Sequence, residues 1–76
     1  MLVHSFSDRQ TYAVCVVEQL KPYQGVLIIR INGVEIHREN VPLAYDARFG
    51  PNYDDLQSWE KIASKVIDAH HLSRIK

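Results

Sequence analysis

The feature that most restricts the fold of this chain is the stretch VLIIRINGVEIHRE at residues 26–39. Asn32 and Gly33 stand between two runs rich in β-branched residues. A two-residue type I′ turn needs positive φ at both central positions, which Asn and Gly adopt most readily. The stretch therefore predicts a β-hairpin. Counting outward from the turn predicts these opposed pairs: Ile31 with Val34, Arg30 with Glu35, Ile29 with Ile36, and Ile28 with His37.

The predicted register gives the hairpin two unlike faces, because successive side chains of a strand point to opposite sides. One face is wholly apolar and comprises Leu27, Ile29, Ile31, Val34 and Ile36. The other face mixes apolar and charged side chains and comprises Val26, Ile28, Arg30, Glu35, His37 and Glu39. A slip of one residue would exchange the two sets, so the turn and the hydrophobic pattern support the same register.

More strands and one helix are predicted around the hairpin. The run TYAVCVVEQL has no clean period, but its content of Val, Thr and Tyr favours a strand. Residues 2–6 offer a short fourth strand. From Asp54 to about His70, apolar residues recur about every 3.6 residues. In a helix they would lie on one side, which is typical of a helix at the protein surface. Leu72 falls on the polar side, which predicts that the helix ends after His71.

These elements predict an α+β fold, in which a three-stranded antiparallel meander, or a four-stranded one with residues 2–6, carries one C-terminal helix on one face. The helix is expected to lie on the apolar face of the hairpin, so that the five residues of that face, including Val34 and Ile36, belong to the core. Seventy-six residues, 46% of them apolar, fit a single small domain over residues 1–76. One Cys excludes an intramolecular disulfide. No apolar run approaches the roughly 20 residues of a membrane span. The N-terminus lacks the pattern of a secretory signal, so a cytoplasmic location is expected.

The stretch AYDARFGPNYDDLQSW at residues 44–59 is dense in charged and aromatic side chains. Asp54 followed by Gln57 fits a capping box at the start of the helix, and Asn52 with Asp55 offers a second register. The aromatic side chains are expected to close the ends of the sheet–helix sandwich. Long connections are often functional, however, which keeps a binding loop open as a hypothesis. The residues of that candidate loop are Tyr45, Asp46, Arg48, Phe49 and Tyr53.

Neither catalysis nor a bound metal or cofactor is expected. Cys15 lies in the apolar run AVCVV with no adjacent cation, which indicates a buried, unreactive thiol. His70 and His71 are neighbours, whereas two His ligands on one helix are usually three or four residues apart. The acids near the helix start lack the spacing of a Ca²⁺ loop. Nucleophile-elbow, dinucleotide-binding and P-loop motifs are absent from the sequence.

The function expected from these features is that of a small non-catalytic interaction or accessory protein. One helix covers only one face of the sheet, so the open face or a strand edge is available to a second copy or to a larger protein partner. The residues predicted for this interface are Val26, Ile28, Arg30, Glu35 and His37.

Two alternatives differ in the class of partner. In the first, the open face would bind single-stranded nucleic acid by stacking and clamping its bases. The residues expected to do so are Tyr12, Tyr23, Arg30, His37 and Arg38. Nine basic residues balanced by nine acidic ones, without a basic block, disfavour binding to a phosphate backbone. The second alternative is an accessory subunit that lends its 44–55 loop to the active site of another chain.

Overall fold

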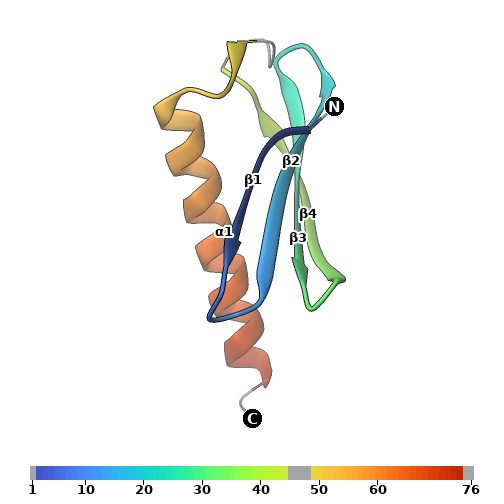
Figure 1. Cartoon of the computed structure of the whole chain (residues 1–76), viewed down its shortest axis with the longest axis vertical. Coiled ribbons are helices and arrows are strands. Elements are labelled where there is room, and N and C mark those ends of the chain that lie inside the picture. Colours follow the sequence, from blue (N-terminus) through green and yellow to red (C-terminus); the bar gives the residue numbers. More distant parts are fainter. Residues whose placement is uncertain (1, 45–48, 75–76) are drawn as a thin grey trace.

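The computed structural model describes residues 2–44 and 49–74. Its elements, in chain order, are β1 (Leu2–Asp8), β2 (Ala13–Lys21), β3 (Gln24–Ile31), β4 (Val34–Pro42) and α1 (Tyr53–Arg74). The strands form one antiparallel sheet in the order β1-β2-β3-β4, and α1 runs along one face of it (Figure 1). The predicted meander with a C-terminal helix is therefore confirmed, with residues 2–8 as its fourth strand.

The β3–β4 hairpin has the predicted turn but only part of the predicted register. Asn32 and Gly33 have φ values of 52° and 81°, as a type I′ turn requires. Beyond the first two pairs the register shifts, and His37 rather than Ile36 stands opposite Ile29. Ile36 is thus the extra residue of a β-bulge. The predicted pairs of Ile29 with Ile36 and of Ile28 with His37 are wrong.

The core lies between the sheet and α1. Its buried residues are Ala13, Cys15, Val17, Leu27, Ile29, Ile31, Val41, Leu43, Trp59, Ala63 and Ile67. Ile36 packs against this cluster, as predicted, but the side chain of Val34 is 64% exposed. Val34 begins an edge strand beside the turn, where a neighbouring strand covers it on one side only. Placing Val34 in the core was therefore wrong.

Helix α1 extends along the whole sheet. Its 22 residues span about 33 Å, and a nine-residue strand such as β2 spans about 30 Å. The helix continues to Arg74, so the prediction that it ends after His71 is wrong. Leu72 is exposed, as its predicted place on the polar side of the helix implied. No helix among the described residues combines the length and the apolar character needed to cross a membrane.

The start of α1 is capped by Asn52. Its side-chain oxygen Oδ1 accepts a hydrogen bond of 2.8 Å from the backbone N–H of Asp55. The alternative that paired Asn52 with Asp55 is therefore the observed one, and the Asp54–Gln57 capping box is wrong. The Gln57 amide instead donates to the Tyr53 hydroxyl at 2.9 Å. The Asp55 carboxylate accepts a hydrogen bond from the backbone N–H of Ala44 at 3.1 Å, which ties the end of the sheet to the first helical turn.

Replacing Asn52 with Ala is expected to lower the free energy of unfolding by about 1 kcal/mol, because an N–H of the first turn loses its acceptor. Urea unfolding followed by circular dichroism measures this loss. Asp54→Ala is the control, since it removes only an exposed side chain and should change the stability by less than about 0.5 kcal/mol. A larger loss for Asp54→Ala than for Asn52→Ala would restore the rejected capping box.

Candidate interaction surface

The sheet face opposite α1, termed the outer face, is not covered by any described element (Figure 1). Its members follow from the strand register, because directly opposed residues share a face. From β1 to β4 they are Leu2, Ser5 and Ser7; Val14, Val16 and Glu18; Val26, Ile28 and Arg30; and Glu35, Arg38 and Asn40.

Two predicted interface residues, Val26 and Ile28, lie in the middle of the outer face. They are only 4% and 3% exposed, yet they do not belong to the core cluster beneath α1. Since no described element lies over this face, their cover comes from the side chains of the adjoining strands. For Ile28 the opposed residues are Val16 and Arg38. The centre of the face is therefore already shielded within one chain.

The exposed apolar surface of the outer face belongs to other residues. Val14 is 46% exposed and lies between Ser7 and Arg30 in the sheet. Leu2 is 60% exposed and stands opposite Glu18. Neither residue was among those predicted for the interface. Val14 sits in a run without a clear period, and its outward direction follows only once the strand register is known.

Charged side chains of both signs also lie on the outer face. The Arg38 guanidinium donates two hydrogen bonds to the Glu35 carboxylate, from Nη2 to Oε1 at 2.9 Å and from Nε to Oε2 at 3.3 Å. These bonds hold the pKa of Glu35 below its ordinary value and raise that of Arg38, and the positive charge of Arg30 also favours the ionised Glu35. Arg30 and Glu35 stand directly opposite each other on the outer face, as predicted.

His37 does not belong to the outer face, contrary to the prediction. The bulge at Ile36 turns His37 toward the side of the sheet that carries α1, where it stands opposite Ile29. Its Nε2 atom lies 2.9 Å from Oε1 of Glu39, which is on the same side of β4. His37 is therefore removed from the candidate interface.

The candidate binding loop is described in part. Phe49 and Tyr53 are 80% and 70% exposed, so the expectation that they close an end of the sandwich is wrong. Tyr45, Asp46 and Arg48 lie outside the described residues. Phe49 and Tyr53 are two exposed aromatic side chains near the start of α1, and a binding role for this loop stays a prediction.

The residues proposed for nucleic-acid binding are not brought together. Tyr12 and Tyr23 lie in the turns that precede and follow β2, at opposite ends of that strand, with φ values of 55° and 65°. The guanidinium of Arg38 is already paired with Glu35. The open face therefore does not combine aromatic rings with free cations, as a single-strand-binding sheet does.

Among residues 2–44 and 49–74, the side chains capable of metal or thiol chemistry do not form a site. Cys15 is buried. Burial is the main cause, and the negative charge of Asp8 the smaller one, that raises the pKa of its thiol and so opposes formation of the thiolate. The ring centroids of His70 and His71 lie 6.1 Å apart. In the part of the chain that the structure describes, no group of three His, Cys, Asp or Glu side chains is placed to hold a metal ion.

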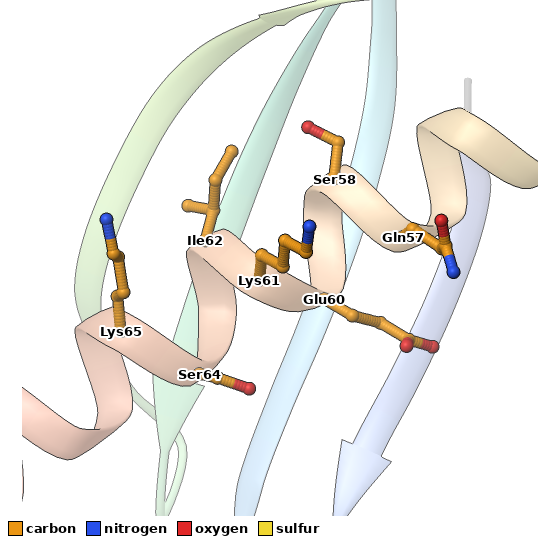
Figure 2. Close-up of a pocket in the computed structure, with 7 residues that line it drawn as sticks. All are labelled: Gln57, Ser58, Glu60, Lys61, Ile62, Ser64 and Lys65. Carbon is orange, nitrogen blue, oxygen red and sulfur yellow. The ribbon is translucent and has the colours of Figure 1, made fainter.

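A shallow hollow on α1, drawn in Figure 2, carries no site either. All of its lining residues belong to one helix, and they are Gln57, Ser58, Glu60, Lys61, Ile62, Ser64 and Lys65. No second element closes over it, whereas ligand sites are concave and have convergent polar groups.

Comparison with known proteins assigns no family to the chain, because no protein-family model, no curated protein and no solved structure matches it.

Proposed function

We propose that this chain is a small, non-catalytic interaction protein that associates with a second copy of itself through the outer face of its sheet. The observation that carries the proposal is the exposure of Val14 and Leu2 on a face that no described element covers. Exposed apolar groups with charged side chains beside them are typical of association surfaces. The cytoplasm remains the location we expect.

The charges of the outer face support a second copy as the partner. Glu18 provides negative charge and Arg30 provides positive charge, whereas Glu35 and Arg38 are already paired with each other within the chain. A twofold axis places the same patch on both sides of an interface, so a patch with both signs can set acids against bases. Two antiparallel sheets that pack face to face are also a common arrangement. The equal numbers of acidic and basic residues remove any net repulsion between copies.

Analytical ultracentrifugation tests the proposal. The wild-type chain is expected to sediment as a dimer, and its melting temperature should rise with protein concentration because association stabilises the folded state by mass action. Val14→Lys is expected to yield a folded monomer, since it replaces an exposed apolar side chain of the outer face with a second cation beside Arg30.

Val34→Lys is the matched control. It makes the same chemical change at a more exposed strand residue, but on the side of the sheet that carries α1. This variant should remain dimeric. A wild-type chain that is monomeric at every concentration, with a melting temperature independent of concentration, would refute the homodimer. Equal dissociation by both variants would show that the outer face is not the contact.

A further inference from the structure

A groove of about 440 Å³ runs between the edge strand β1 and helix α1, away from the outer face. Its floor is apolar and is formed by Phe6, Cys15, Ala63 and Ile67. The other lining residues are Ser7, Asp8, Gln10, Thr11, Glu60, Ser64 and Asp68. Both β1 and α1 thus contribute a wall, and β2 supplies part of the floor.

The polar wall of the groove carries three carboxylates and no lysine or arginine. Glu60 and Asp68 lie on α1 with Ser64 between them, at intervals of four residues, so they share one side of the helix over about 12 Å. Figure 2 shows Glu60 and Ser64 pointing to the side of α1 where β1 runs. Asp8 stands across from them at the end of β1, near enough to the floor for its charge to act on Cys15.

These carboxylates have no cationic partner among the described residues. The ion pairs found there are His37 with Glu39 and Arg38 with Glu35, both on β4. Asp8 accepts one hydrogen bond, from the backbone N–H of Gln10 at 3.0 Å, which leaves acceptor capacity on the carboxylate. The groove is therefore an acidic slot with an apolar floor.

The wall formed by β1 has a second property, which is a free strand edge. Among the described strands β1 pairs with β2 only, so the backbone N–H and C=O groups along its other side have no strand partner there. Ser7 lines the groove although its side chain belongs to the outer face, which shows that the groove reaches this edge. An extended chain laid there can form main-chain hydrogen bonds and reach the carboxylates at once.

We infer that the groove between β1 and α1 binds an extended, basic segment of a partner protein. The backbone of that segment adds a strand beside β1. The side chains of that segment point alternately to the two sides of the added strand, so every second one faces α1, and Lys or Arg at those positions pairs with Asp8, Glu60 and Asp68. Charge complementarity and the free edge select this occupant over an acidic or a helical one. Apart from Ser7 at its rim, the groove shares no residue with the outer face, and the inference does not depend on the proposed homodimer.

Fluorescence anisotropy with a labelled peptide of alternating Lys and Val residues tests the inference on the whole chain, and the matching Glu–Val peptide serves as the charge-reversed probe. The Lys–Val peptide should bind and the Glu–Val peptide should not. In ¹H–¹⁵N spectra the Lys–Val peptide should shift the amides of β1 and of residues 60–68. The double variant Glu60→Gln/Asp68→Asn should weaken binding about tenfold, since two partly exposed charge pairs are lost.

The double variant Glu18→Gln/Asp54→Asn is the matched control, because it changes the net charge equally at the outer face and at the helix start. It should leave the affinity unchanged, as should Val14→Lys. Equal weakening by both double variants would overturn the inference in favour of unspecific attraction. Failure of the Lys–Val peptide to bind, equal binding of the Glu–Val peptide, or shifts confined to the outer face would also overturn it.

Discussion

Replacing Trp59 with Ala is expected to bring the chain close to global unfolding at room temperature. The Trp59 side chain is 1% exposed and lies in the core cluster between α1 and the sheet, with its ring centroid 6.1 Å from that of His4 on β1. Truncation of a buried Trp costs about 3–5 kcal/mol, because apolar contacts are lost and a cavity remains. A chain of 76 residues typically has only about 4–11 kcal/mol of stability in total. Urea unfolding followed by far-ultraviolet circular dichroism measures the loss without a Trp signal.

Phe49→Ala is the control for this prediction. It also removes a large aromatic side chain, but one that is 80% exposed, so the change in stability should stay below about 0.5 kcal/mol. Similar small losses for both variants would show that Trp59 does not hold α1 against the sheet.

The hairpin shows how far local sequence determines this fold. The Asn32–Gly33 turn is determined locally, because the φ values it requires suit those two residues. The bulge at Ile36 is not, because a bulge depends on how β4 adapts to the twist of the sheet and to the helix packed on it. This one extra residue moves His37 from the outer face to the side of α1, so one local irregularity changed the predicted interface.

The start of α1 could not be predicted uniquely, because two capping arrangements compete in the same short stretch of sequence. Asn52 and Asp54 are both good N-cap residues, and sequence alone offers both registers. The observed choice lets the Asp55 carboxylate reach the backbone of Ala44, a tertiary contact that neither register reveals in the sequence. The exposure of Phe49 likewise depends on the path of the connection rather than on residue type.

The groove between β1 and α1 could not be predicted from the sequence, for a different reason. Asp8 and Asp68 come from opposite ends of the chain, and they share a groove only because α1 runs beside the edge strand β1. That arrangement requires both the order of the strands and the crossing position of the helix. The sequence predicted β1 merely as an optional strand. The fold class was thus predictable from periodicity and turn chemistry, whereas the surfaces that bind partners depend on registers between distant segments.

Ile29→Ala is expected to lower the free energy of unfolding by about 2–5 kcal/mol, the second large effect. Ile29 lies in the inner strand β3, where it is fully buried between Cys15 of β2 and His37 of β4. Strands on both sides and α1 above hold its surroundings in place, so they can close little of the space left by three missing carbon atoms. Urea unfolding by circular dichroism gives the loss.

Ile62→Ala is the comparison variant, which tests whether the large loss is specific to the centre of the core between the sheet and α1. Ile62 also contributes to the packing of α1, but it is only partly buried at the margin of the cluster, and Ala has the higher helix propensity. Its loss should therefore stay below about 2 kcal/mol and clearly below that of Ile29. Losses under about 0.5 kcal/mol at both positions would mean that the buried and open faces of the sheet are exchanged. Equal large losses would place Ile62 in the centre of the core and shift α1 toward β4.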